Sequence, residues 1–269
     1  MKRYLNCLSI AGSDPYGGAG VQADLKTFSA LGCYGATVIT ALTVQNSEGV
    51  RKSVATNAQL VYEQAEAVFE DIPIDAVKIG MTVNKDIIEI TAKLMEKYRP
   101  RFVILDPVMV SSSGHRLLDE EAVAVLKKQL IPLCDLVTPN IPELSVLSGG
   151  LDSTMTAAHK LIDETGCRHV LIKGGHRDGE PTDLLVSAKK HWEYPGHRVN
   201  SQNTHGTGCT LSSAIAAFSA QGIDLPEAVG EAKKYIERAL QTGADVFAGK
   251  GHGSMNHFFK GQRLIIKDF

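Results

Sequence analysis

The feature that most constrains this chain is the regular alternation of short apolar runs with longer amphipathic segments. Short runs rich in β-branched residues are typical of buried strands, and longer segments with one apolar face are typical of helices. Strands and helices that alternate in this way predict crossover units around a mostly parallel sheet. We therefore expect an α/β fold, a three-layer α/β/α sandwich.

The expected elements can be placed by residue number. Strands are predicted at 4–10, 34–44, 76–79, 102–105, 135–138 and 170–172, and helices at 21–31, 57–69, 85–98, 119–130, 153–165, 207–220 and 226–242. The segments 183–187 and 191–194, joined by a short polar turn, predict an antiparallel edge hairpin. Residues 263–266 predict a last edge strand. Asn57 and Asp224 have the character of helix caps. Without a repeat or linker, the chain 1–269 is expected to form one domain.

Composition excludes several classes of protein. The formal net charge is −2, so no basic excess calls for a nucleic acid partner. No run approaches the roughly 18 apolar residues of a membrane span, and the apolar stretch at the N-terminus is too short for a signal peptide. The five cysteines form no CxxC pair, which argues against a zinc site or a disulfide framework. We expect a cytoplasmic protein without nucleic acid or membrane partners.

Ligands of open α/β sheets bind outside the carboxyl ends of the strands. The polar or small residues that follow the expected strands are therefore the ones to consider for chemistry. They are Gly12 to Asp14, Gln45, Asn46, Gly80, Met81, Asp106, Asn140, Lys173 and Gly174.

The strongest motif is NTHGTGCT at residues 203–210, immediately before an expected helix. Gly206 and Gly208 allow backbone N–H groups to turn inward, and the helix start adds its positive dipole end. Residues 206–209, including Thr207, thus predict a catalytic anion cradle. Cys209 would lie in the first turn, where the pKa of a thiol is lowered. A glycine-rich helix start with a buried cysteine is the alternative, which the length of the motif disfavours.

Three further strand ends carry charged or amide side chains. Asn140 and Glu143 can serve a phosphate and the water shell of Mg²⁺, although a capping box explains them better. Asp106 is a candidate metal ligand or a turn cap. Lys173, beside two glycines, either reaches phosphate oxygens or is a solvated turn lysine, with equal weight.

The first half of the chain offers candidates for binding an organic ring. Gln45 ends a buried strand, and its amide can donate and accept at once, which suits the edge of an aminopyrimidine. Met81 can pack flat against a ring, although core packing is the safer interpretation. Residues 11–26 match neither standard nucleotide loop, so a flexible turn is one interpretation. Asp24 and Gln22 are expected near the mouth of a ligand site formed by this loop, and a polar ligand could use both.

Together these segments resemble one family. IAGSDPYGGAGVQADLKTF, VITALTVQN, VKIGM, LDPVMV, TPNIPE, IKGGH and NTHGTGCTLS look like the hydroxymethylpyrimidine/phosphomethylpyrimidine kinases of thiamine biosynthesis, in the ribokinase superfamily. The motifs occur in matching order from about residue 5 to 259. The resemblance implies a ribokinase-like fold and an enzyme that uses ATP and Mg²⁺. It implies two steps, phosphorylation of 4-amino-5-hydroxymethyl-2-methylpyrimidine and then of its monophosphate, and a homodimer.

The resemblance also implies roles for individual residues. Asp24 and Gln45 match pyrimidine-binding residues, Met81 and Val108 match ring contacts, and Gly12 falls in the substrate-contacting first motif. Cys209 matches the catalytic position and residues 206–209 match the anion hole. Asn140 and Lys173 match the phosphate neighbourhood, and Asp106 and Glu143 the metal neighbourhood. Tyr16, His115 and the segment 254–257 depart from the usual family residues, and we expect none of them to touch the cradle.

Two alternatives remain open at this stage. A pyridoxine or pyridoxal kinase would share the fold, and its substrate is also a ring with a hydroxymethyl group; Gln45 weakly favours the aminopyrimidine. A non-catalytic metabolite-binding module is disfavoured by the intact cradle and by the absence of a DNA-reading helix pair.

Overall fold

A computed structural model of the chain describes residues 2–111, 114–150, 153–176, 180–261, 263 and 265–268. Its main sheet is formed by the strands β2 (Asn6–Ser13), β3 (Tyr34–Asn46), β4 (Gly49–Ala55), β5 (Ala76–Ile79), β6 (Val103–Leu105), β7 (Leu136–Val137), β8 (His169–Ile172), β9 (Asp183–Ser187) and β10 (His191–Tyr194). Within the described residues, these strands lie in the order β10-β9-β8-β7-β6-β5-β2-β3-β4.

The centre of this sheet is parallel and its edges are antiparallel. Neighbouring strands from β3 through β2, β5, β6, β7 to β8 run parallel. β9 and β10 form the antiparallel hairpin that the sequence predicts, and β4 pairs antiparallel with β3 at the opposite edge. Strand order reverses at β2, the first strand of the sheet in the chain, which lies between β5 and β3.

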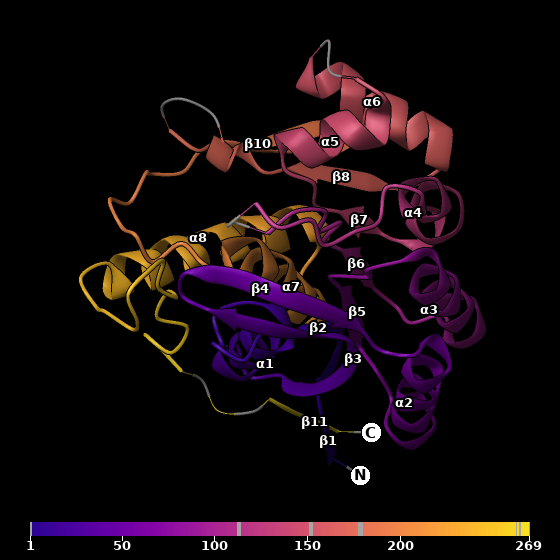
Figure 1. The fold of residues 1–269 in the computed structure, drawn as a ribbon, viewed down its shortest axis with the longest axis horizontal. Coiled ribbons are helices and arrows are strands. Elements are labelled where there is room, and N and C mark those ends of the chain that lie inside the picture. The colour runs from indigo at the N-terminus through magenta and orange to yellow at the C-terminus, as the bar shows by residue number, and fades with distance from the viewer. Residues whose placement is uncertain are drawn as a thin grey trace.

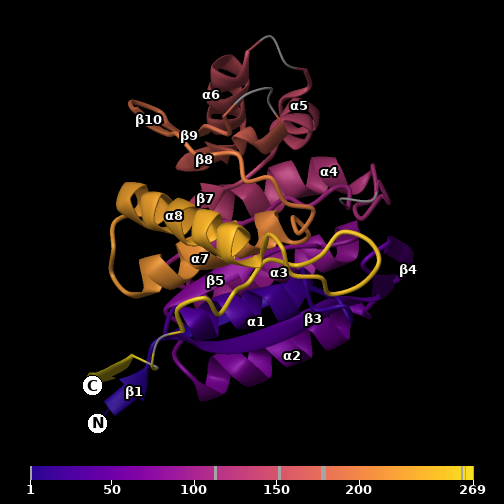
Figure 2. The same ribbon diagram turned by 90° about the vertical axis from the view of Figure 1, so that its left-hand side faces the viewer.

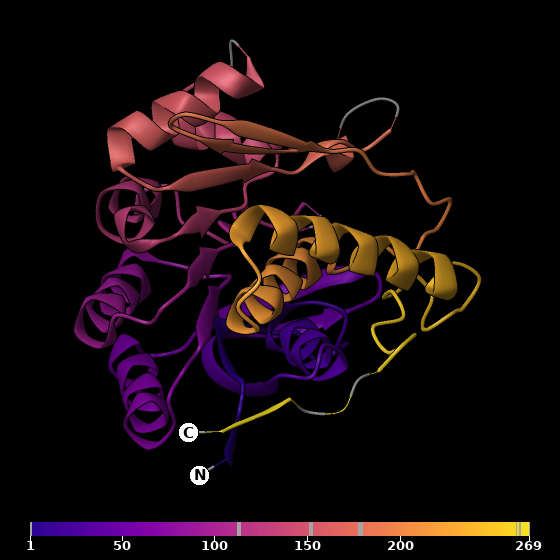
Figure 3. The ribbon, with the colours of Figure 1, turned by 180° about the vertical axis from the view of Figure 1, so that it is seen from behind.

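Helices cover both faces of the sheet, which confirms the three-layer sandwich (Figures 1 and 3). One layer contains α2 (Ala58–Asp71), α3 (Lys85–Tyr98), α4 (Ala122–Val125), α5 (Ile141–Ser148) and α6 (Thr154–Thr165). The other contains α1 (Gly20–Ala30), α7 (Thr207–Ala220) and α8 (Leu225–Gly243). Figure 2 shows α7 and α8 side by side, with α1 next to α7.

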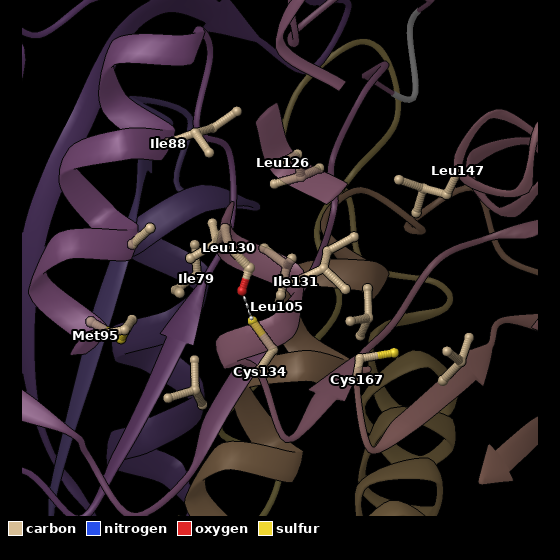
Figure 4. Packing of buried hydrophobic residues seen from close by; sticks show 14 of the residues in the cluster. Ile79, Ile88, Met95, Leu105, Leu126, Leu130, Ile131, Cys134, Leu147 and Cys167 are labelled. Atoms are coloured by element: carbon tan, nitrogen blue, oxygen red, sulfur yellow. Dashed lines mark hydrogen bonds between the residues drawn. The ribbon is translucent and has the colours of Figure 1, made fainter. Parts of the chain in front are cut away.

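Successive side chains along the strands point to opposite faces of the sheet and pack into two separate hydrophobic cores. Val77 and Ile79 of β5 pack into the core under α2 to α6, whereas Ala76 belongs to the core under α1, α7 and α8. The central strands β2, β5 and β6 are thus buried on both faces, as expected of a sheet covered by crossover helices, whereas β3 is only partly buried. Figure 4 shows the first core, where Ile79 and Leu105 lie against the helices and the Cys134 thiol donates to the Leu130 carbonyl at 3.2 Å.

Two helix starts carry the caps that the sequence predicts. Asn57 accepts hydrogen bonds from the backbone N–H groups of Gln59 and Leu60 at the start of α2. Asp224 accepts from the Glu227 N–H at the start of α8. Each cap satisfies donors that the first turn of a helix leaves unpaired.

Some element boundaries differ from expectation. The segment 4–10 contains a break at Leu5 that separates β1 (Lys2–Tyr4) from β2. The expected last edge strand at 263–266 is wrong: β11 (Ile266–Asp268) pairs with β1 in a separate two-stranded sheet, which brings the two ends of the chain together (Figure 1).

The expected helix 119–130 also has a different form. It starts at Ala122 in α4 and widens into the π-helical turn η1 (Leu126–Leu130), followed by the 3₁₀ turn η2 (Ile131–Leu133). Pro132 has no N–H to donate to the carbonyl four residues before it, so an α-helix cannot continue there. Among the residues that the structure covers, no helix is long and apolar enough to cross a membrane.

Candidate active site

The residues that the sequence singles out collect at the carboxyl ends of the parallel strands. Gly12 and Gln45 are the next-to-last residues of β2 and β3, and Met81 follows β5. Asp106 directly follows β6. Beyond β7 and β8, Asn140 and Lys173 form a parallel bridge. The start of α7 closes this group from the other helix layer.

A cluster of charged side chains centres on Lys173. Its Nζ lies 2.6 Å from Asp106 Oδ1 and 3.8 Å from Glu143 Oε2. A Cβ placed on Gly208 would lie 3.3 Å from that Nζ and 3.4 Å from Asp106 Oδ2. Hence the backbone at Gly208 faces the ammonium group across a space that a side chain would fill.

Burial governs the charges of this cluster. Burial alone would lower the pKa of Lys173, but the carboxylates of Asp106 and Glu143 raise it above its ordinary value. Burial raises the pKa of Glu143, and Lys173 opposes this effect. Lys173 is therefore a permanent cation that can meet phosphate oxygens.

Two carboxylates can face a metal ion here, although the described residues contain no cluster of three or more His, Cys, Asp or Glu with metal-site geometry. Asp106 and Glu143 are both buried. Mg²⁺ typically uses one or two carboxylates and takes its other ligands from waters and substrate phosphates. The pair fits such a site and does not fit a metal cage made of protein alone.

The capping interpretation of Asn140 and Glu143 is also confirmed. Asn140 Oδ1 accepts from the Glu143 N–H and Glu143 Oε2 accepts from the Asn140 N–H, both at 2.8 Å. This capping box fixes the start of α5. It also holds one oxygen of Glu143 3.8 Å from Lys173.

The cradle has the expected helix-start geometry. Gly206 caps α7 with φ of 82°, a backbone conformation that favours glycine. A Cβ at Gly206 would collide with the carbonyl oxygen of Gly18, so the first loop and the cradle touch closely. Within the described part of the chain, the N–H groups of Gly208 and Cys209 have no backbone acceptor. They are available to an anion at the positive end of the helix.

The expected lowering of the pKa of Cys209 is wrong. Burial raises this pKa to about 11, Lys78 lowers it less strongly, and Asp24 and Asp106 add to the rise. The positive end of the helix would lower the pKa of the thiol, but desolvation disfavours the charged thiolate and has the larger effect. Cys209 is accordingly a thiol at neutral pH.

Asp24 also lies elsewhere than expected. Its side chain is completely buried, and Lys78 Nζ donates to both carboxylate oxygens at 2.9 and 2.8 Å. Ser9 and Ser213 donate to the same carboxylate at 2.5 and 2.6 Å. Because these partners surround Asp24, the structure does not present it to a ligand at the mouth.

The ring-binding candidates lie on the side of β2 and β3. A Cβ on Gly12 would lie 2.9 Å from Met81 Sδ, so the glycine lets the thioether approach the strand. Met81 is 8% exposed. Gln45 is partly buried, and its amide nitrogen lies 3.1 Å from His205 Nε2. Val108 is half-buried two residues after Asp106, and its N–H donates to the Asp106 carbonyl.

Sequence reasoning missed one residue and one pairing. Lys78 is a lysine inside the buried strand β5, and this position was itself a signal, since a buried lysine needs a partner. Asp14 and His205 form a pair at 2.9 Å although 191 positions separate them. No local pattern connects them.

Two of the family departures contact the residue that precedes the cradle. The Tyr16 ring lies 5.8 Å from the His205 ring, and Ser254 forms a parallel bridge with His205. These contacts are made to His205 and not to residues 206–209. His115 is exposed, and its N–H donates to Ser111 Oγ.

The model of the family described as phosphomethylpyrimidine kinase matches residues 14–256. The chain belongs to this family. The matched range contains every part of the candidate site except Gly12.

Relatives agree with this membership. The chain is 46% identical over 258 residues to the hydroxymethylpyrimidine/phosphomethylpyrimidine kinase of Rhizobium meliloti, covering 94% of this chain and 97% of that one. It is 48% identical over 255 residues to the thiamine biosynthesis bifunctional protein of Geobacter sulfurreducens. That match covers 93% of this chain but 51% of the relative, so the chain spans about half of the bifunctional protein.

A solved structure gives the same fold. The ADP complex of Bacillus subtilis pyridoxal kinase superposes with a TM-score of 0.85 at 33% identity, covering 95% of this chain and 98% of that one. The fold is therefore that of the ribokinase-like vitamin kinases.

Proposed function

We propose that this family member transfers phosphoryl groups from ATP to a pyrimidine. It phosphorylates the hydroxymethyl group of 4-amino-5-hydroxymethyl-2-methylpyrimidine and then the resulting monophosphate, in thiamine biosynthesis. The names of relatives matched over nearly their whole length support this reaction. The observation that carries the proposal is the approach of Gly208 to Lys173 and Asp106, which leaves room for an anion between a helix start and a partly buried cation.

Phosphoryl transfer needs positioning and neutralisation of charge more than covalent chemistry. The N–H groups of residues 206–209, with Thr207 at the first helical position, would hold the transferring group. Lys173 would meet its oxygens from the opposite side, and Asn140 would meet the nucleotide phosphates.

A magnesium ion would be held by Asp106 and Glu143 together with nucleotide phosphates. Its contribution would be to neutralise charge on the phosphates. Asp106 accepts from Lys173 and from the Thr138 hydroxyl at 2.6 and 3.3 Å, so its carboxylate is already oriented by protein groups.

The pyrimidine would bind between Gln45 and Met81, with Gly12 giving room and Val108 as a second ring contact. Gln45 would pair with the amino and ring nitrogen edge. Asp24 supports this site indirectly, because it holds the buried Lys78 beneath it.

A pyridoxal kinase activity is the second candidate, since the Bacillus subtilis structure is a pyridoxal kinase. We favour the pyrimidine because Gln45 offers a donor and an acceptor together. We also propose that residues 1–269 form one kinase domain and that the protein is a cytoplasmic homodimer.

The test is an ATP-consumption assay with the pyrimidine alcohol, its monophosphate and pyridoxine in parallel. We expect turnover of the first two and a much lower kcat/KM for pyridoxine. Gln45→Ala should raise the KM of the pyrimidine alcohol about tenfold or more and leave that of ATP unchanged, since it removes a partly buried donor and acceptor. Turnover of pyridoxine alone would overturn the proposed substrate.

A further inference from the structure

His205 lies between the carboxylate of Asp14 and the amide of Gln45, which is proposed to bind the edge of the pyrimidine. Its Nε2 lies 2.9 Å from Asp14 Oδ2 and 3.1 Å from the Gln45 Nε2 position. The side chains of His205 and Asp14 are 11% and 3% exposed. The three residues come from the cradle motif, the first loop and the end of β3, so the contact joins the phosphate side of the site to the ring side.

Asp14 determines whether the ring nitrogen Nε2 of His205 carries a hydrogen. Its Oδ2 also accepts from the N–H groups of Gly18 and Ala19 at 3.0 and 2.8 Å, and Oδ1 accepts from Tyr16 N–H at 2.9 Å. Burial would raise the pKa of Asp14, but these bonds and His205 lower it below its ordinary value. A carboxylate only accepts, so His205 Nε2 must be an N–H donor.

This donor constrains the Gln45 amide. An amide NH₂ facing an N–H would leave two donors opposed, so the amide oxygen belongs on the His205 side, where it shares the single Nε2–H with Asp14 Oδ2 in a three-centre hydrogen bond. The amide nitrogen then faces Thr43, which is 3.3 Å from the other end of the amide. The Thr43 hydroxyl donates to the Ser13 carbonyl at 2.8 Å, which leaves its oxygen free to accept.

We propose that His205 is a specificity-determining positioning residue, which fixes the orientation of the Gln45 amide through the Nε2–H that Asp14 imposes. With one lone pair and one N–H of Gln45 engaged, one lone pair and one N–H remain for the ligand. That is the complement of an aminopyrimidine edge, and pyridoxine has no amino group to use it. The inference rests on the proposed function and explains how the site distinguishes the aminopyrimidine from pyridoxine.

Neighbouring groups hold both the backbone and the ring of His205. Its backbone N–H donates to the Gly253 carbonyl at 3.1 Å, and Ser254 bridges the same residue. Gly18 lies so close that a Cβ there would collide with the ring. The Tyr16 ring lies 5.8 Å away. Held from several directions, His205 can transmit the geometry of Asp14 to Gln45.

Substitutions at one position separate this role from packing. His205→Phe keeps the ring shape and removes the donor, whereas His205→Gln places an amide N–H near the Nε2 position. We expect His205→Phe to raise the KM of the pyrimidine alcohol about tenfold or more, with the KM of ATP unchanged. Its preference for the pyrimidine over pyridoxine should fall similarly, and His205→Gln should restore most of both. Tyr16→Phe, which keeps the ring contact, is the matched control and should retain the parent preference.

A spectroscopic measurement reads the same arrangement without activity. In the chain labelled with ¹⁵N-histidine, long-range ¹⁵N–¹H spectra should show His205 with a protonated Nε2, and Asp14→Asn should shift the ring toward the other tautomer. A parent spectrum with Nε2 unprotonated overturns the inference, as does equal selectivity in the Phe and Gln variants. If the parent fails to turn over the pyrimidine, the proposed function is lost, while the spectrum still decides the orientation of His205.

Discussion

Lys78 and Asp24 form an ion pair inside the protein, with Nζ 2.8 Å from Oδ2 and both side chains fully buried. Burial alone would lower the pKa of Lys78, but Asp24, Cys209 and Asp106 raise it to about 12. Ser213, which donates to Asp24, lies one helical turn after Cys209 on α7. The pair thus supports the floor of the site between β5 and the helix that carries the cradle.

Removing one partner of this pair should be costly. Lys78→Met would leave an uncompensated buried carboxylate, and we expect a loss of about 3–5 kcal/mol in the free energy of unfolding, measured with urea. The double variant Lys78→Met with Asp24→Asn should recover part of the loss, because no buried charge then remains. Glu120→Gln, which breaks an exposed pair with Arg116, is the control and should keep the parent midpoint. A Lys78→Met midpoint equal to that of the parent would contradict the electrostatic account.

The pH dependence of stability should reveal the protonation of His257. Burial lowers the pKa of this side chain to about 4, with Lys26 adding to the effect, and its Nε2 lies 3.0 Å from Thr210 Oγ1. Because the pKa is lower in the folded state, the unfolded chain binds the proton first. The contribution is complete above pH 6.5 and is lost as the pH falls through 4, by about 3 kcal/mol.

Urea unfolding of the parent and of His257→Gln between pH 7 and 4 measures this loss. The variant has no titrating group there, so its stability should fall less steeply while carboxylates contribute equally in both proteins. Parallel curves would mean that His257 does not remain neutral in the folded protein.

The two glycines of the cradle should respond differently to alanine. Gly206→Ala places a side chain at φ of 82° against the Gly18 carbonyl, so it should lower the melting temperature and the activity together. Gly208→Ala meets only the ends of Lys173 and Asp106, at 3.3 and 3.4 Å, and should fold normally. Its methyl group takes the space proposed for the phosphoryl group, so kcat/KM should fall about 100-fold or more with both acceptors. Unchanged turnover in a folded Gly208→Ala enzyme would place the anion elsewhere.

Local sequence signals predicted most of the fold. The strand at 76–79, the helices at 85–98 and 207–220 and the hairpin strands agree with the structure to the residue. The strand Gly49–Ala55 was missed because Arg51 and Lys52 interrupt its apolar character at an exposed edge. The pairing of β11 with β1 depends on where the chain ends meet, which periodicity does not encode.

The site was predictable where it follows strand ends and not where it depends on long-range contacts. The glycines of the cradle and Lys173 carry their signal in short motifs, and topology brings them together. The burial of Asp24 depends on Lys78, 54 positions away, and its serine partners. Desolvation decides the sign of the pKa shift at Cys209, which a helix-start rule alone gets wrong.

The two phosphorylation steps should differ in their need for Cys209. The first acceptor is an alcohol whose proton must leave, whereas the second is a phosphate that is already an anion. With its pKa raised to about 11, Cys209 is almost entirely a thiol at neutral pH, so it can take the alcohol proton only from a small thiolate fraction. The single-turnover rate of the alcohol step should therefore rise about tenfold per pH unit between pH 7 and 9, and the rate of the monophosphate step should not.

Cys209→Ala should slow the alcohol step about 10²–10⁴-fold and abolish this rise, while the monophosphate step stays near the parent rate because the backbone donors of the cradle remain. Rapid-quench measurements on one preparation with both acceptors give the comparison. Equal losses in both steps would mean that Cys209 maintains the shape of the cradle, and no loss in either would make it a packing residue.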